Sequence, residues 1–139
     1  MKTLTLITSV IFFILIALRC EDTSETSEVD VGSKPTDVKI TAVKLFKDYE
    51  SNEVAADEKY KNKILEVTGT IEDISVVLGQ IFIDLKTGEY ELTSIHCSFS
   101  DTHKSKIAKL RKGQSVTVKG RCTGMLLNLG ITLEKCVIL

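Results

Sequence analysis

The sequence has one proline, no tryptophan and almost no net charge. Its 139 residues carry 18 lysines and arginines against 19 aspartates and glutamates, a formal net charge of −1. This balance excludes a strongly basic nucleic-acid binder on charge alone, and the composition excludes collagen-like, low-complexity and coiled-coil classes. With 43% hydrophobic and 27% charged residues, the chain is expected to form a soluble globular protein of one domain.

Motifs of catalytic sites are also missing. The sequence contains no Cys-x-x-Cys, no Gly-x-x-x-x-Gly-Lys loop, no Gly-x-Ser-x-Gly elbow and no His-Glu-x-x-His. Its two histidines, His96 and His103, are not at metal-ligand spacing. Neighbouring carboxylates such as Glu72 and Asp73 face opposite ways on a strand. The sequence therefore predicts a protein that is not an enzyme, with no metal site and no cofactor.

Residues 1–19 are predicted to be a signal sequence. Lys2 precedes a mostly apolar run from Leu4 to Leu18. That run of about 15 residues is shorter than the roughly 20 that span a bilayer, and its place at the N-terminus is typical of a secretory signal. A short uncleaved anchor is the alternative, and either one carries the rest of the chain across a membrane.

Cys20 ends this run and resembles the cysteine that bacterial lipoproteins acylate after the signal is removed. A polar segment follows Cys20, as in those proteins. Arg19 departs from the pattern, because the residue before a lipidated cysteine is usually small, and Leu18 is also atypical. The resemblance implies a membrane-attached lipoprotein of the cell envelope. An ordinary signal peptide cut nearby is the alternative.

Residues 20–37 are predicted to be a flexible acidic tether. Six acids stand against one basic residue, Lys34, and small polar residues make up much of the rest. Such a segment cannot bury enough apolar surface to offset the entropy of ordering it. Pro35 stands shortly before the predicted folded domain, residues 38–139.

The front of this domain is predicted to be helical. Thr41 is expected to cap an amphipathic helix that reaches Tyr49. Asn52 is expected to cap a second helix, or the continuation of a bent one, that ends near Tyr60.

The rest of the domain is predicted to be mainly strands. A turn is expected at residues 76–80, and a helix between the third and fourth strands is expected to begin at Ser100 and to end at Gly113. Gly69 and Gly120 are expected on inward faces where a small barrel bends. Five short strands with this helix are the plan of an OB-fold barrel, mainly β with α. The strands are predicted at residues 63–72, 81–85, 90–99, 115–122 and 131–139.

Four spaced motifs run through the predicted domain: Asn52-Glu53-x-Ala55-x-Asp57-x-x-Tyr60, Leu65-x-Val67-x-Gly69-x-Ile71, Val116-x-Val118-x-Gly120-x-Cys122-x-Gly124 and Leu133-x-x-Cys136. Together they resemble the tRNA-anti-like group of OB-fold proteins. Members of that group are mostly bacterial, and many have lipoprotein signals. The resemblance implies the fold; it implies no catalytic residue, because the motifs are structural and a fold does not fix a function.

Three cysteines, Cys97, Cys122 and Cys136, fall on apolar faces of predicted strands. One interpretation is core packing, since a free cysteine behaves as a small hydrophobe. The other is a disulfide, which an exported protein permits. The third and fifth strands of an OB-fold are parallel neighbours, which favours Cys97 with Cys136. Cys122 with Cys136 is the alternative, although their hairpin is expected to put them out of register.

The expected nucleic-acid surface of an OB-fold is the outer face of its first three strands, where aromatic side chains and a basic groove hold the strand. Here Phe82 is the one clear aromatic on that face, and the other side chains are acidic or neutral. Nucleic acid is therefore an unlikely partner on this reading. Basic residues concentrate later, in a cluster that predicts either a solvated face or a contact with an anionic partner such as lipid headgroups: Lys104, Lys106, Lys109, Arg111 and Lys112.

These patterns predict a non-enzymatic OB-fold module of the bacterial cell envelope, a lipoprotein that binds an unknown protein or small ligand or acts as a structural part. A nucleic-acid-binding OB-fold protein is the first alternative, and a thiol redox protein is the second.

Overall fold

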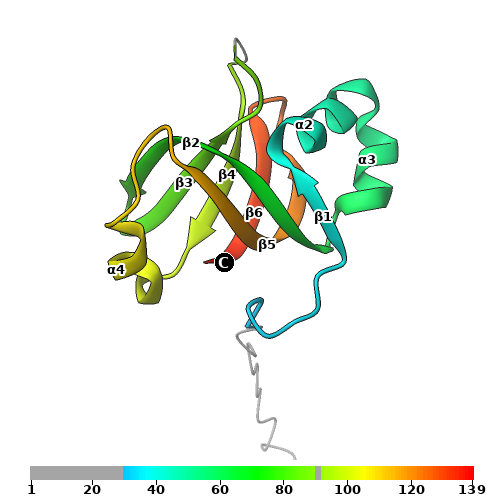
Figure 1. Ribbon diagram of the computed structural model, residues 1–139. Coiled ribbons are helices and arrows are strands. Elements are labelled where there is room, and N and C mark those ends of the chain that lie inside the picture. Colours follow the sequence, from blue (N-terminus) through cyan, green and yellow to red (C-terminus); the bar gives the residue numbers. More distant parts are fainter. Residues whose placement is uncertain (1–29, 90–91) are drawn as a thin grey trace, which may run out of the picture.

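The computed structural model describes residues 30–89 and 92–139 (Figure 1). The predicted signal sequence, Cys20 and the first part of the predicted tether lie outside these residues. Within the described ranges, no helix has the length and apolar character to cross a bilayer. The elements are β1 (Val38–Thr41), α2 (Ala42–Ser51), α3 (Glu53–Tyr60), β2 (Ile64–Val77), β3 (Gln80–Lys86), β4 (Ser94–Phe99), the 3-10 helix η1 (Asp101–His103), α4 (Lys104–Ile107), β5 (Ser115–Met125) and β6 (Gly130–Ile138).

Strands β2 to β6 close into a barrel. The order in the sheet is β1-β2-β3-β4-β6-β5, and β2 also pairs with β5, which joins the two ends. The third and fifth barrel strands, β4 and β6, pair in parallel as expected, and the other barrel pairs are antiparallel. The predicted five-stranded OB-fold barrel, with helices in front and a helix between the third and fourth strands, is confirmed.

Strand β1 was not expected from the sequence. It pairs in parallel with the first half of β2, from Val38 opposite Leu65 to Thr41 opposite Thr68. The run Val38-Lys39-Ile40-Thr41 alternates apolar and polar residues, but it is only four residues long, the shortest run in which alternation indicates a strand.

The turn predicted at residues 76–80 is narrower in the structure. Val76 and Val77 still pair with Ile81 and Gln80, so β2 continues through them. Only two residues, Leu78 and Gly79, make the turn, and both have positive φ angles of 50° and 82°. This is the two-residue hairpin geometry, with both central residues at positive φ.

The two N-terminal helix caps are confirmed. The Thr41 hydroxyl accepts a hydrogen bond from the Lys44 amide at 3.2 Å, and the Asn52 side-chain oxygen accepts one from the Ala55 amide at 3.1 Å. The later helix differs from expectation. It starts as the 3-10 turn η1 without a side-chain cap at Ser100, and α4 ends at Ile107, well before Gly113. This helix therefore contributes one buried residue to the core, Ile107.

Gly69 and Gly120 lie where neighbouring elements approach closely. A Cβ atom at Gly69 would lie 2.9 Å from the Cβ of Ala42, and one at Gly120 would lie 2.6 Å from the Sγ of Cys136. Both distances are too short for real atoms, so only glycine lets α2 pack on β2 and lets Cys136 pack on β5. The expectation that both glycines face inward is met.

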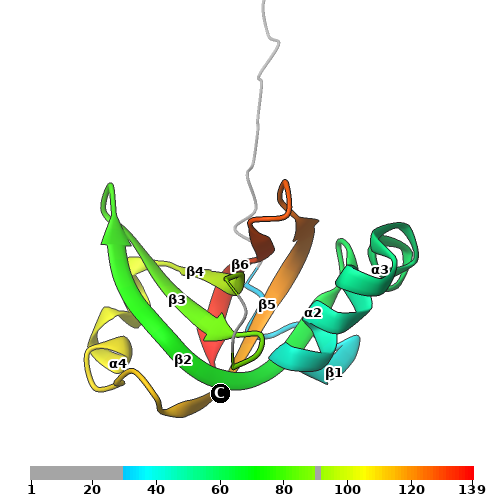
Figure 2. The same ribbon diagram turned by 90° about the horizontal axis from the view of Figure 1, so that it is seen from above.

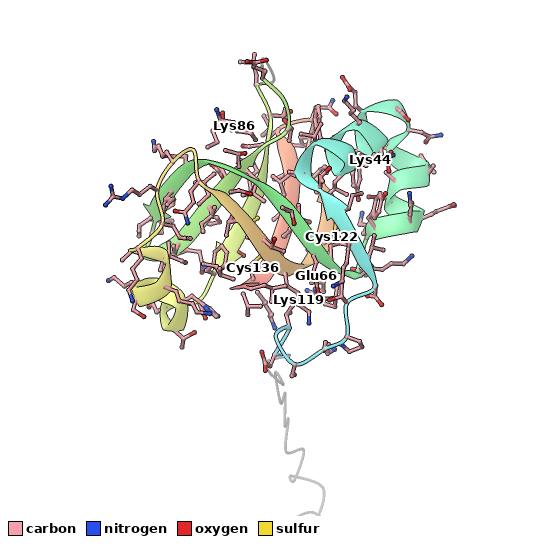
Figure 3. The ribbon with its side chains drawn as sticks, in the orientation of Figure 1. Lys44, Glu66, Lys86, Lys119, Cys122 and Cys136 are labelled. Atoms are coloured by element: carbon pink, nitrogen blue, oxygen red, sulfur yellow. The ribbon has the colours of Figure 1, made fainter. Side chains whose placement is uncertain are left out.

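Residues 31–37 lie against the barrel. Val31 is buried, and the ammonium of the largely buried Lys119 donates to the carbonyl oxygens of Gly32, at 3.2 Å, and Lys34. The Thr36 hydroxyl also donates to Glu66 on β2. Figure 3 places Lys119 at the lower end of the barrel, beside this segment. The last part of the predicted tether is therefore packed on β5 and β2 in the structure.

Candidate ligand-binding face

The outer side of β3 and β4 presents a row of half-buried polar and aromatic side chains. Successive residues of a strand point to opposite faces. Every second residue of the two strands therefore points into the core and is buried: Ile81, Ile83 and Leu85 of β3, and Ile95, Cys97 and Phe99 of β4. The remaining side chains form an outer surface that we call the binding face, and in register they pair Phe82 with Ser98 and Asp84 with His96.

Asp84 and His96 form a close pair at the centre of the binding face. The His96 Nδ1 lies 2.8 Å from the Asp84 Oδ1. The hydrogen bond with the Asp84 carboxylate raises the pKa of His96, partial burial opposes this, and the charges of Asp84 and Glu72 add to the rise. A protonated imidazole donates from both nitrogens, so the charged form of His96 has a second bond to offer.

That second nitrogen faces the turn between β5 and β6. The His96 Nε2 lies 3.4 Å from the Leu129 carbonyl oxygen. Gly130, the next residue, packs so closely that a Cβ there would lie 2.4 Å from the Ser94 carbonyl oxygen. The β5–β6 turn is thus held against β4, and protonation of His96 strengthens the contact.

Two exposed apolar turns flank the binding face. The end of the β2–β3 hairpin exposes Val76 and Val77 of β2 and Leu78 of the turn, with Leu78 fully exposed. The β5–β6 turn exposes three leucines, of which Leu127 is 82% exposed. Both turns project to the same side of the barrel, with β4 and β6 between them (Figure 2). We call these two segments, residues 76–78 and 126–129, the rim turns.

The binding face has a carboxylate, an imidazole, hydroxyls and one aromatic ring, with the exposed Lys86 at its edge. These groups can hold a ligand by hydrogen bonds and by apolar contact. Across the described residues, no three His, Cys, Asp or Glu side chains come together to hold a metal.

All five residues of the predicted basic cluster are exposed, and we call them the basic patch: Lys104, Lys106, Lys109, Arg111 and Lys112. It lies on α4 and on the turn that follows. Lys112 pairs with Asp73, which lowers the pKa of that carboxyl. The Lys106 ammonium donates to the Ile138 carbonyl at 3.3 Å. The structure therefore leaves these five residues exposed, on α4 and in the segment that leads to β5.

The three described cysteines are buried free thiols in the structure. The nearby Cys136 thiol raises the pKa of Cys97, and burial raises it further. Burial also raises the pKa of Cys122, whose sulfur lies 3.7 Å from the Tyr49 hydroxyl. The thiolate is the reactive form of cysteine, so these surroundings disfavour a thiol redox site. The pairing of Cys97 and Cys136 as a disulfide stays a prediction.

A family model, tRNA_anti-like, matches residues 1–138 of the chain. The chain belongs to the tRNA_anti-like family. The match includes the predicted signal sequence and tether as well as the barrel. The family resemblance read from the four sequence motifs is therefore confirmed.

Solved structures share the fold of this tRNA_anti-like protein. A Klebsiella pneumoniae subsp. pneumoniae MGH 78578 protein, described as a putative nucleic acid-binding lipoprotein, is 18% identical; the match covers 76% of this chain and 99% of that chain, with a TM-score of 0.60. The S. pombe Stn1-ten1 complex matches at 12% identity over 55% of this chain and 57% of that one, with a TM-score of 0.42. An Entamoeba histolytica asparaginyl-tRNA synthetase matches at 17% identity over 57% and 21%, also with a TM-score of 0.42. No curated protein matches the chain.

The rim turns of this tRNA_anti-like protein were not singled out from the sequence. Residues 125–129 are mostly leucine. An apolar run inside a segment otherwise typical of a turn is the signal that the sequence offers. The pairing of His96 with Asp84 depends on the register of β3 and β4, which the sequence does not state.

Proposed function

We propose that this tRNA_anti-like protein is a non-enzymatic binding module of the bacterial cell envelope, anchored as a lipoprotein through Cys20, and that its ligand lies on the binding face between the two rim turns. The observation that carries the binding role is the pair of exposed apolar turns on either side of a half-buried polar floor.

Exposed apolar residues are common singly, but clusters of them mark interaction sites. Here two clusters from separate hairpins project to one side of the barrel. The floor between them carries Phe82 and the Asp84–His96 pair, which can fix the orientation of a ligand by hydrogen bonds. The ligand that fits has apolar surface at both ends and a polar group between them.

The envelope location is supported by the N-terminal sequence. An apolar run too short to span a bilayer ends at Cys20, and polar residues follow. The Klebsiella protein with the same fold is also described as a lipoprotein. That protein is described by binding rather than by catalysis, which is consistent with a non-enzymatic role.

Site-specific photo-crosslinking tests the binding face. A photoreactive residue placed at Leu127 should capture a ligand or partner in cell-envelope extracts, and a Leu78→Asp change on the opposite rim should reduce that capture. The matched control is the same probe at Val54, an apolar residue that is 73% exposed on α3. Equal capture from Leu127 and Val54, or capture unaffected by Leu78→Asp, would show that the rim turns do not form the site.

Metabolic labelling tests the anchor. Cells grown with a radioactive fatty acid should label the wild-type protein and not Cys20→Ser. An unlabelled wild-type protein, or a mature N-terminus other than Cys20, would replace the lipoprotein with a secreted protein or one held by its N-terminal segment.

Nucleic-acid binding is the second candidate function. It is favoured by the description of the Klebsiella protein and by the half-exposed ring of Phe82 on the binding face. Against it, the floor carries Asp84 at its centre and one lysine, Lys86, at its edge, whereas strand-binding OB-folds use a basic groove.

A further inference from the structure

We propose that the basic patch docks on anionic phospholipid headgroups of the membrane that holds the anchor, so that the α4 end of the barrel faces the bilayer. The inference rests on the lipid anchor at Cys20 proposed above. It adds the orientation of the domain and a second, electrostatic contact with the membrane.

The basic patch and the start of the described chain meet at the end of β6. The Lys106 ammonium donates to the carbonyl of Ile138 at 3.3 Å. Gly32 lies over the preceding residue, where an added Cβ would be 3.6 Å from the Cγ1 of Val137. Figure 1 shows α4, the C-terminus and the first described residues at the same lower end of the barrel. The first described residues and Lys106 of the patch therefore both lie near the end of β6.

The packed segment limits how far the barrel can lie from the anchor. Val31 is buried and Lys119 binds the carbonyls of Gly32 and Lys34. Only residues 21–29 separate Cys20 from Asp30. Even fully extended, ten Cα-to-Cα steps span no more than about 36 Å. An anchored Cys20 thus confines this end of the barrel near the surface, where a charged patch can make contact.

The charge of the patch fits an anionic surface. Its five cationic side chains are exposed, and the acids beside them are Asp101 at the start of η1 and Asp73, which pairs with Lys112. The cationic excess remains after these two are counted. Each lysine or arginine near an anionic membrane strengthens binding by about five-fold, and the effect falls off within a Debye length of about 8 Å at physiological salt.

Lysine labelling on vesicles tests the orientation. The acylated full-length mature protein is inserted into vesicles of phosphatidylcholine alone or with about 30% phosphatidylglycerol, and a membrane-impermeant amine reagent is followed by mass spectrometry. Lys104, Lys106 and Lys109 should react at least about three-fold more slowly on the anionic vesicles, and about 0.5 M salt should abolish the difference. Lys44 and Lys86, which lie toward the other end of the barrel, should react equally on both (Figure 3).

A pair of variants separates the patch from general charge. Lys109→Gln with Arg111→Gln should remove the protection of Lys104 and Lys106, whereas Lys44→Gln with Lys86→Gln should keep it. Equal labelling on both vesicles, or protection of Lys44 and Lys86 instead, would overturn the docking. Slow labelling of the patch already in lipid-free detergent would mean that the acids of residues 21–29 cover it, which also overturns the proposal.

The same samples report the anchor separately. The mass of the N-terminal peptide shows whether Cys20 is acylated. An acylated chain whose patch lysines ignore phosphatidylglycerol overturns the docking alone, and a chain without acyl groups overturns the anchor on which the docking rests.

Discussion

At the scale of single residues, the Asp84–His96 pair ties the floor of the binding face to the β5–β6 turn. The hydrogen bond with Asp84 is the largest cause of the raised pKa of His96. Because the pKa of His96 is higher in the folded than in the unfolded protein, the pair stabilises the fold. The stabilisation is complete at pH values below about 6.5, the pKa of histidine in an unfolded chain. This stabilisation is lost as the pH rises through the folded pKa.

Asp84→Asn should therefore lower the pKa of His96 and reduce the stability of the protein more at pH 6 than at pH 8. An NMR titration of the imidazole protons measures the first effect, with His103 as the internal reference. Thermal unfolding of both proteins at the two pH values measures the second. An unchanged His96 titration in Asp84→Asn would show that the pair does not form in solution.

Cys97 and Cys136 lie on the parallel neighbours β4 and β6, and Cys136 raises the pKa of the Cys97 thiol. If the protein is exported as proposed, we expect the two to form a disulfide, so that reduction lowers the melting temperature; a typical disulfide contributes ~2–4 kcal/mol. Mass spectrometry of unreduced peptides identifies the bond directly. If all three of Cys97, Cys122 and Cys136 are alkylated in the unfolded, unreduced protein, this prediction is wrong.

At the scale of elements, the close approach of β6 to β5 depends on Gly120. Gly120→Ala would drive a methyl group into the Sγ of Cys136 and should cost about 1–3 kcal/mol of unfolding free energy, the usual range for overpacking. Cys136→Ala removes the obstructing sulfur, so the double variant should lose less than the sum of the two single changes. Denaturant unfolding of the four proteins measures this coupling. If the losses of the two single variants simply add in the double variant, the sulfur of Cys136 is not what excludes a side chain at position 120.

The segment of residues 31–37 should depend on Lys119. Lys119→Met keeps the apolar stem but removes the two donated hydrogen bonds, and charged hydrogen bonds of this kind are worth ~1.5–3 kcal/mol each. Hydrogen exchange at residues 31–37 should become faster while β5 and β6 stay protected. Arg121→Met is the control, because the exposed Arg121–Glu134 pair should contribute less than about 1 kcal/mol. Equal exchange in all three proteins would contradict the role of Lys119.

Elements with a long or capped pattern were predictable from the sequence, and those defined by pairing were not. Thr41 and Asn52 carry short-range cap signals that the structure keeps. Strand β1 and the full length of β2 depend on partners distant along the chain, Leu65 for Val38 and Ile81 for Val76. A local pattern contains no information on such partners, because the hydrogen bonds form only after the barrel closes.

The candidate site was less predictable than the fold for the same reason. The basic patch was found because its residues are close in sequence. The binding face joins β3 and β4 to two turns, and the rim turns come from hairpins about fifty residues apart, a separation that only the closed barrel removes. The packing of residues 31–37 was likewise hidden, because Lys119 lies 87 residues beyond Gly32.

At the scale of the whole molecule, the charges are divided between two ends. The basic patch surrounds α4, whereas the binding face has Asp84 at its centre. A nucleic acid would therefore meet the basic patch outside the face that OB-folds commonly use, and on that face it would meet Asp84 at the centre and Lys86 at the edge. This separation leads to an expectation for oligonucleotide binding that distinguishes the two candidate functions.

Single-stranded oligonucleotides should bind weakly, with dissociation constants no tighter than the ~10⁻⁴–10⁻⁶ M of non-specific contacts. The residual affinity should fall steeply with salt and should be lowered by Lys109→Gln with Arg111→Gln, because phosphates would contact the basic patch. Phe82→Ala should leave it unchanged. Fluorescence anisotropy with labelled DNA and RNA at several salt concentrations measures all three. Tight binding that resists salt and loses ~1–3 kcal/mol in Phe82→Ala would instead show base stacking on the binding face, and nucleic-acid recognition would then replace the function proposed for that surface.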